Sequence, residues 1–326
     1  MRPLVTAIVA TLGACSSFEN PEVVVDLRVV AITSDPPEQV VAFDVAAPPT
    51  PAEVLAELGP IDVCALIADP AQARGVHYAF TLCAYDDGGR CAPDLQVSLV
   101  EGVLPDPETA AEPRVCLTIT PDDDFLSILV STLRGDQLAG LGGIDALLQL
   151  TVRGEDEPAS ATQYAARTLR VTPRLPAARQ ANRNPTLDRL DVELRGGTGA
   201  GPVPLAPGRC RDQPAPFEVA PGQQVRLTPV EPATARETYV VPTLDGRTQT
   251  FTESLTYQWI ATAGNFSAGS TGGTRDGFGN APELFTDWRA PRAADLTGPT
   301  DVDVWVLQRD ERLGLTPRLA CLRVVP

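Results

Sequence analysis

Cysteine is the residue type in this sequence with the widest chemistry, because it forms disulfides, binds metals and accepts lipids. The chain has seven cysteines, so at least one stands outside any intramolecular disulfide. Cys15 is set apart, since it follows an apolar run at 4–13 and precedes a polar stretch. An even remainder is typical of a disulfide-bonded protein in an oxidising, exported compartment. These six are Cys64, Cys83, Cys91, Cys116, Cys210 and Cys321.

The positions of the six remaining cysteines favour one set of pairs. Two of them flank the stretch AYDDGGR, which is typical of a hairpin turn, and two are alone in a predicted second domain. The competing interpretation is a metal site, but the sequence has no C-x-x-C spacing and a single histidine. We therefore predict no metal and three disulfides: Cys64–Cys116, Cys83–Cys91 and Cys210–Cys321.

His77 is the only histidine, and it lies in the apolar stretch GVHYAFTLC. A histidine base needs a nucleophile and an orienting acid, and no G-x-S-x-G motif accompanies it. The sequence contains no lysine, which excludes Schiff-base and Walker-type chemistry. The stretch GGTGAGP at 196–202 has Pro202 where a dinucleotide loop needs its third glycine. We predict no catalytic residue, no cofactor and no enzyme activity.

Clustered carboxylates offer further candidate sites, each with a simpler explanation. The run TPDDDF at 120–125 could bind calcium, but acidic residues at the start of a helix also offset its positive end. Asp276, Asn280 and Glu283 lie in a glycine-rich stretch without the alternating Asp-x-Asp of calcium loops. Among 42 acidic residues, nothing selects a pair for glycosidic chemistry. The tryptophans suit either a sugar platform or a sandwich core: Trp259, Trp288 and Trp305.

The charge of the chain excludes some partners. Its formal net charge is −16, so its surface repels the backbone of nucleic acids and the headgroups of anionic lipids. Any attachment to a membrane therefore has to come from something other than electrostatics. The composition, with 43% hydrophobic residues, 26 glycines and 32 prolines, fits a turn-rich β protein with a substantial core.

The residues before Cys15 have the features of a secretory leader. Arg2 gives a positive start, and the apolar run after it is shorter than the roughly 20 residues that span a bilayer. The end of the run resembles the lipobox of bacterial lipoproteins: Leu12-Gly13-Ala14-Cys15. The resemblance implies a signal peptide over 1–14, a lipid on Cys15 and a lipidated tether over 15–22. Ser16, which is not aspartate, implies sorting to the outer membrane of a Gram-negative cell.

The sequence from 23 to 173 predicts a β-rich first domain with two helices. Thr50, Pro51 and Glu53 give the capping signal of a short helix that Gly59-Pro60 ends. A second helix is predicted from Pro121 to Arg134, with Thr120 as its cap. Strands are predicted at 22–33, 61–69, 75–85, 94–100, 114–120, 146–154 and 161–173.

A polar, proline-bearing stretch at 174–186 is predicted to link the first domain to a second at 187–326. Alternation is clearest at 301–307, where three valines share one face and Asp301, Asp303, Trp305 and Leu307 share the other. The stretches LTYQWIATAGNFS, FTDWRAP and VDVWVLQRDERLG resemble the Ig-like and PKD-like domains of bacterial surface lipoproteins. This resemblance covers about 185–326 and implies a β-sandwich. We predict an all-β protein of two Ig-like β-sandwich domains, the first with short helical insertions.

The stretch from 264 to 287 is predicted to form one long surface loop, because it is rich in glycine, serine and threonine. Phe278 is the one large apolar residue among its central glycines, and it either packs down as a plug or stands exposed to contact a partner. Asp276, Phe278 and Asn280 are the candidate binding residues, because long loops on rigid sandwiches often carry binding functions.

Together these features predict a lipid-anchored cell-envelope protein that acts as a non-catalytic binding or structural module at the outer membrane. Its expected partners are the membrane, through the N-terminal lipid, and an envelope protein or polysaccharide. The alternative is an envelope hydrolase or a sugar-binding accessory protein that uses carboxylates and exposed tryptophans.

Overall fold

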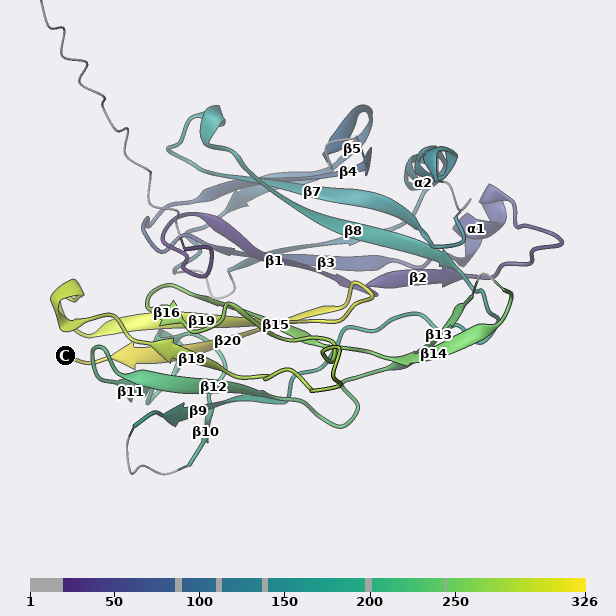
Figure 1. Ribbon diagram of the computed structural model, residues 1–326. Helices are drawn as coiled ribbons and strands as arrows, with labels where there is room; N and C mark the ends of the chain where they lie inside the picture. Colours follow the sequence, from purple (N-terminus) through teal and green to yellow (C-terminus); the bar gives the residue numbers. More distant parts are fainter. Residues whose placement is uncertain (1–19, 86–89, 110–112, 137–139, 197–200, 244) are drawn as a thin grey trace, which may run out of the picture.

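The computed structural model describes residues 20–85, 90–109, 113–136, 140–196, 201–243 and 245–326. In these ranges the chain forms two β-sandwiches, one from each half of the sequence, that lie one above the other (Figure 1). Three clusters of buried apolar side chains fill the spaces between the sheets: one lies inside each sandwich and one lies between the two sandwiches. The predicted all-β fold of two sandwiches is thereby confirmed.

The first sandwich packs a sheet of three strands against a sheet of five. The smaller sheet has the order β1 (Arg28–Asp35), β3 (Ile61–Ala68) and β6 (Arg114–Ile119). The larger sheet has the order β2 (Glu38–Val41), β8 (Gln163–Pro173), β7 (Ile144–Gly154), β4 (Val76–Tyr85) and β5 (Cys91–Leu104). Alternate side chains of both sheets, such as Val63, Phe80 and Leu148, are fully buried between them.

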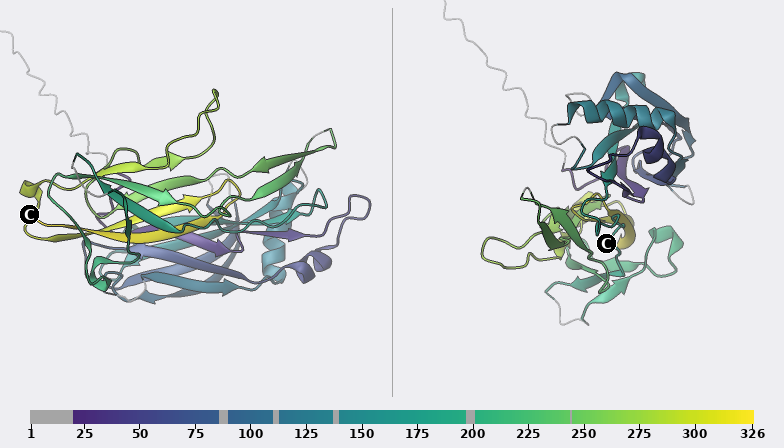
Figure 2. Two further views of the ribbon diagram at one scale, coloured as in Figure 1. Left: turned by 90° about the horizontal axis from the view of Figure 1, so that it is seen from below. Right: turned by 90° about the vertical axis from the view of Figure 1, so that its right-hand side faces the viewer.

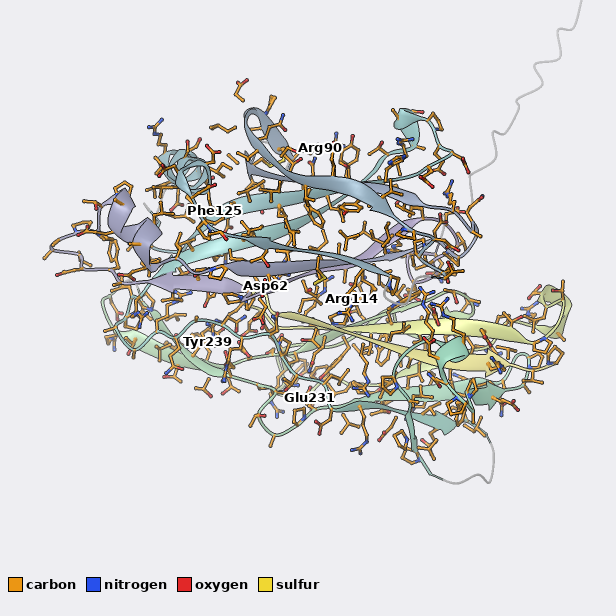
Figure 3. The ribbon with its side chains drawn as sticks, turned by 180° about the vertical axis from the view of Figure 1, so that it is seen from behind. Asp62, Arg90, Arg114, Phe125, Glu231 and Tyr239 are labelled. Carbon is orange, nitrogen blue, oxygen red and sulfur yellow. A yellow bond between two sulfur atoms is a disulfide. The ribbon has the colours of Figure 1, made fainter. Side chains whose placement is uncertain are left out.

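Two helices cover one end of this sandwich. Helix α1 (Pro51–Glu57) begins as predicted, because Thr50 accepts a hydrogen bond from the Glu53 backbone and the Glu53 carboxylate accepts one from the Thr50 backbone. Helix α2 (Asp123–Gly135) begins later than predicted, since Asp122 and not Thr120 accepts the capping bond, from Phe125 N at 2.9 Å. Phe125 packs from α2 into the core (Figure 3).

The second sandwich packs two sheets of five strands. One has the order β10 (Val203–Leu205), β9 (Arg189–Leu194), β12 (Gln224–Val230), β18 (Thr286–Arg289) and β16 (Asn265–Phe266). The other has the order β11 (Phe217–Val219), β20 (Leu315–Val324), β19 (Thr300–Arg309), β15 (Thr256–Ala261) and β17 (Ser270–Gly272). A separate hairpin of β13 (Thr238–Pro242) and β14 (Thr248–Thr252) extends toward the helical end of the first sandwich (Figure 1). Short 3₁₀ turns lie at η1 (Ala159–Ala161), η2 (Cys210–Asp212) and η3 (Ala293–Asp295).

Strand β19 shows how the sandwiches join. Val302, Val304 and Val306 face the core of the second sandwich, as the alternation predicts. Trp305 and Leu307 face the other way and enter the apolar layer between the two sandwiches. The first sandwich meets them with Val30 and other residues of β1 and β3. Trp305 is 1% exposed, so the second apolar face of β19 is buried by the neighbouring sandwich.

The segment from Asn20 to Val24 lies on the second sandwich before the chain enters the first. Val24 N donates to the Ala261 carbonyl and Ala261 N donates to the Glu22 carbonyl, both at 2.8 Å, so the segment extends the β15 edge beyond β17. Val24 is 1% exposed. The described chain therefore starts fixed to one end of the elongated molecule, the end that also holds the C-terminus (Figures 1 and 2).

Three disulfides join the same pairs that the sequence predicts: Cys64–Cys116 between β3 and β6, Cys83–Cys91 between β4 and β5, and Cys210–Cys321 between η2 and β20. The last ties the first part of the second sandwich to its final strand. No helix in the described part of the chain is long and apolar enough to cross a membrane.

Candidate functional site

The long loop predicted for 264–287 is shorter in the structure, and this prediction is wrong in extent. Strands β16, β17 and the start of β18 lie inside that range and belong to the two sheets of the second sandwich. Trp259 N donates to the Gly269 carbonyl at 2.9 Å, and the Glu22 side chain occupies the space that a Cβ at Gly269 would need. Only residues 273–285 leave the sandwich between β17 and β18, and we call them the β17–β18 loop.

Backbone bonds close the base of the β17–β18 loop. Gly272 N donates to the Glu283 carbonyl at 2.9 Å, and Thr271 Oγ1 donates to the Leu284 carbonyl at 2.8 Å. Gly272 and Gly273 both have positive φ, at 76° and 101°, which lets the chain turn out of the sheet at a point that a side chain would strain. The loop therefore leaves a rigid sheet edge and projects to one side of the molecule (Figure 2).

Asp276 organises the tip of the loop. Its carboxylate accepts hydrogen bonds from the backbone of Phe278 and of Asn280, each at 2.9 Å, and from Asn280 Nδ2 at 2.8 Å. These bonds, with the Asn280 side chain first, lower the pKa of Asp276. The Arg275 guanidinium donates to the Gly279 carbonyl at 2.7 Å. The tip is therefore a braced turn whose carboxylate is already satisfied by donors, which suits a turn better than a cation ligand.

Phe278 stands at this tip with 94% of its surface exposed. Of the two predicted alternatives, the exposed one is the one found. The turn thus brings the three candidate residues together. The Asp276 carboxylate holds the backbone, the Asn280 side chain holds that carboxylate, and the Phe278 side chain is presented to solvent. The structure therefore presents a large apolar side chain to solvent on a turn that is held by hydrogen bonds.

The other residues with candidate chemistry have structural roles. His77 is half-buried on the outer face of the larger first-sandwich sheet, and in the described chain no hydroxyl or carboxylate is hydrogen-bonded to it. Asp122 and its two neighbours occupy the start of α2. All three tryptophans are buried, Trp259 and Trp288 inside the second sandwich and Trp305 between the sandwiches. The sugar platform of exposed tryptophans is therefore wrong.

Some predicted features lie outside the described residues: Cys15 with its leader, most of the 196–202 glycine stretch and part of the turn between Cys83 and Cys91. Among the residues that are described, no group of three metal-ligating side chains is found.

The sequence did not indicate the polar contacts that lock the sandwiches together. Glu38, on β2, is 3% exposed and lies between the two sandwiches and the 174–186 segment. Its carboxylate accepts hydrogen bonds from Arg312 Nη2 at 2.6 Å, from Asn182 N at 3.0 Å and from Thr172 Oγ1 at 3.3 Å, and Arg179 lies 3.4 Å away. Arg312 also lies over the ring of Tyr239 on the β13–β14 hairpin, which Figure 3 places at the side facing the first sandwich.

A second charged cluster joins the sandwiches at their other end. Arg209 is 5% exposed and donates to the Glu108 carbonyl at 2.7 Å, while its Nε lies 3.6 Å from the Asp303 carboxylate. Burial raises the pKa of Asp303 to about 6, against the lowering effect of Arg209. At the hairpin, burial raises the pKa of Glu253 to about 7. Buried charges at a contact favour one fixed arrangement of the sandwiches, because a carboxylate leaving its partners would lose its hydrogen bonds.

Comparisons with known proteins identify no family. No family model matches the chain, and no curated protein matches it. Several solved structures are similar to the chain at 10% sequence identity. The native conformation of E. coli alpha-2-macroglobulin matches over 92% of this chain with a TM-score of 0.24, and this chain spans 17% of that protein.

The two tandem V-type regions of VCBP3, a v-region-containing chitin binding protein, match over 92% of this chain and 98% of theirs, with a TM-score of 0.21. The C-terminal domain of the Streptococcus agalactiae AgI/II polypeptide BspA matches over 82% and 93%, also with a TM-score of 0.21.

Proposed function

We propose that the protein is a lipid-anchored module of the bacterial cell envelope that binds a partner through Phe278 and does no catalysis. The observation that carries the binding role is the 94% exposure of Phe278 on a turn braced by Asp276. Moving a water-exposed aromatic side chain into an apolar recess lowers the free energy, and a loop that is already held by hydrogen bonds loses little entropy on binding.

The arrangement of the sandwiches supports this role. Two sandwiches fixed by a buried apolar layer and by the Glu38 contacts form a rigid support for a projecting loop. Binding residues on loops of a rigid scaffold are a common arrangement. His77 lines a recess with Glu101 and Thr151, but no described hydroxyl or carboxylate is hydrogen-bonded to it as a base and its nucleophile would be.

The lipid anchor of the proposal rests on the lipobox-like sequence at Cys15. The docking of residues 20–24 on the second sandwich adds an orientation to it. A tether of five residues from Cys15 to Asn20 reaches at most about 18 Å. An anchored protein would therefore hold the end with Asn20 near the membrane and the helical end of the first sandwich away from it.

The test of the binding role is site-specific photo-crosslinking in intact cells. A photoreactive phenylalanine analogue replaces Phe278 in one variant and Tyr164, 61% exposed on β8, in a matched control. We expect a discrete crosslinked product from position 278 that is absent from position 164 and that an excess of soluble wild-type chain removes, but a soluble Phe278→Ser chain does not. No product from position 278, or equal competition by both soluble chains, would contradict the binding role.

A further inference from the structure

The hairpin of β13 and β14 forms a small sheet of its own, since in the described chain neither strand pairs with a strand of the two sandwiches. Tyr239 on β13 fixes it to the body, because the ring lies under the Arg312 guanidinium and its hydroxyl donates to Glu311 at 2.7 Å. Strand β14 lies at the margin of the molecule (Figure 1), and all five of its residues are exposed. A ribbon of two strands is only marginally stable in water. A further strand added at β14 would therefore stabilise the hairpin.

The register of the hairpin shows which backbone groups of β14 point outward. Glu253 N donates to the Glu237 carbonyl at 2.9 Å, and Thr243 N donates to the Arg247 carbonyl at 2.8 Å. Because hydrogen-bonded positions alternate in an antiparallel pair, every second residue of β14 counted from Arg247 turns its backbone toward β13.

The residues between these positions turn their N–H and C=O groups away from β13. We call them the outward threonines: Thr248, Thr250 and Thr252. No backbone hydrogen bond joins their outward groups to another described residue. The free edge of β14 therefore presents three consecutive donor and acceptor pairs to solvent, which is the pattern that an added strand recognises.

This edge also lacks the features that usually keep edge strands apart. Charged residues, proline and bulges protect an edge from pairing, and glycine weakens a strand. The sequence of β14, TQTFT, contains none of these residues. Each of the other edge strands of three or more residues in the described part of the chain contains at least one: β1, β2, β5, β6, β10, β11, β13 and β17. Strand β14 is thus the edge best suited to pairing.

The edge of β14 is complementary to itself. In an antiparallel arrangement about a two-fold axis at Thr250, this residue lies opposite its own counterpart, and Thr248 lies opposite Thr252 of the second copy. Every outward group then has a partner, because each of these pairs exchanges two backbone hydrogen bonds. The threonine side chains meet on one face, where pairs of threonines across strands are favourable. Such a contact uses the same surface on both copies and closes as a dimer.

The charge of the hairpin also suits a second copy. The chain has a net charge of −16, so two copies repel each other over most of their surfaces. The hairpin residues 238–252 contain one acidic and one basic residue, Asp245 and Arg247, whose side chains are hydrogen-bonded to each other at 2.6 Å. Pairing of two β14 strands therefore places no like charges opposite each other. The hairpin is a neutral part of an acidic molecule.

We propose that the β14 edges of two copies pair antiparallel, with Thr250 on the two-fold axis, so that the two hairpins form one four-stranded sheet across a dimer. Two paired strands of five residues bury less area than a standard interface, so the dimer is weak in dilute solution. Added salt strengthens it, because salt screens the repulsion between the two acidic bodies.

Disulfide trapping tests the register, in the full chain with Cys15→Ser so that an introduced thiol is the only one outside the three disulfides. The Cα atoms of a hydrogen-bonded pair lie about 5.5 Å apart, which a disulfide can span. Thr250→Cys should therefore form a linked dimer under mild oxidation. Thr248→Cys or Thr252→Cys alone should do so at least about tenfold more slowly, because their counterparts lie about 13 Å away. An equimolar mixture of these two variants should form the mixed dimer.

Sedimentation velocity at about 0.5 M salt tests the association without a thiol. Thr250→Pro removes an outward N–H that the hairpin does not use, and Thr250→Lys places two like charges opposite each other at an exposed position. Each should raise the dissociation constant of the dimer at least about tenfold. Thr250→Val is the matched control, because it keeps the N–H and the branched shape, and it should dimerise like the wild type.

Three results would overturn the proposal. The first is a wild-type chain that stays monomeric and a Thr250→Cys chain that forms no linked dimer. The second is equal crosslinking by all three single-cysteine variants, which random collision or a parallel pairing would give. The third is equal dimerisation of the Thr250→Pro, Thr250→Lys and Thr250→Val chains, which would place the contact elsewhere on the molecule.

Discussion

Trp305 offers the sharpest test of how the two sandwiches are joined. The side chain is 1% exposed in the layer between the sandwiches, on a strand whose other face forms the core of the second sandwich. Trp305→Ala therefore removes the largest residue of the interface and leaves the valine face of β19 in place. Truncation of a buried tryptophan costs about 3–5 kcal/mol through lost burial and the cavity it leaves.

The loss should appear as partial separation of the sandwiches. In urea unfolding we expect one transition for the wild type. For Trp305→Ala we expect two resolved transitions, the first at lower urea, because the contact between the sandwiches has lost about 3–5 kcal/mol. Trypsin cleaves this lysine-free chain only after arginine, so cleavage in the 174–186 segment, where Asn182 is 1% exposed, should become faster.

Trp305→Phe is the matched control. The Trp305 Nε1 is buried and has no hydrogen-bond partner among the described residues, so removing it leaves no lost bond. We expect Trp305→Phe to cost less than about 1.5 kcal/mol and to leave the segment resistant to trypsin. A loss below 1 kcal/mol for Trp305→Ala with unchanged proteolysis would show that the apolar layer is not packed in solution, and the rigid two-sandwich account would be wrong.

Three further outcomes follow from named residues. Burial raises the pKa of Asp303 from 3.8 to about 6, so between these pH values the folded state keeps a proton that the unfolded state has released. The free energy of unfolding should therefore fall by at most about 3 kcal/mol as the pH rises from 3.8 to 6. Asp303→Asn should flatten this slope in urea unfolding measured at several pH values. Replacing residues 274–281 with two glycines should change the Tm by only about a degree or two, because all of these residues are exposed. A deletion that also includes β17 should lower the Tm strongly. If the two deletions lowered the Tm equally, the loop would be packed structure. Non-reducing peptide mapping should find Cys210 linked to Cys321, and removing that bridge should cost about 4–5 kcal/mol in the chain-entropy model; a link from Cys210 to Cys64 would contradict the division into two sandwiches.

Local patterns in the sequence predicted the elements well. The capping box at Thr50 and the alternation at 301–307 both describe short-range geometry, and the structure confirms them. Strand β2 was missed, because Pro36-Pro37 indicated a turn and the strand pairs in parallel with β8, more than a hundred residues away. The same pairing buries Glu38, which no local pattern marks as an interior residue.

The candidate site was predicted only in part, for a similar reason. The glycine content correctly predicted a loop around Phe278. It gave no sign of β16 and β17, which form because neighbouring strands offer them backbone hydrogen-bond partners. Exposure of Phe278 depends on how Asp276 closes the turn, and the sequence left both alternatives open. An apolar pocket lined by residues of α1, α2 and the end of β8 requires segments far apart in the chain to meet, so no single segment predicts it.

Mass spectrometry of the mature N-terminus tests the central claim, that this is a lipid-anchored envelope module, most directly. Cleavage after arginine in a chain without lysine gives a first mature peptide of residues 15–28, CSSFENPEVVVDLR. We expect this peptide in the membrane fraction with a diacylglycerol thioether mass on Cys15, and we expect the protein to leave that fraction in a Cys15→Ala variant. A mature chain that begins elsewhere, or a peptide with an unmodified Cys15, would contradict the account.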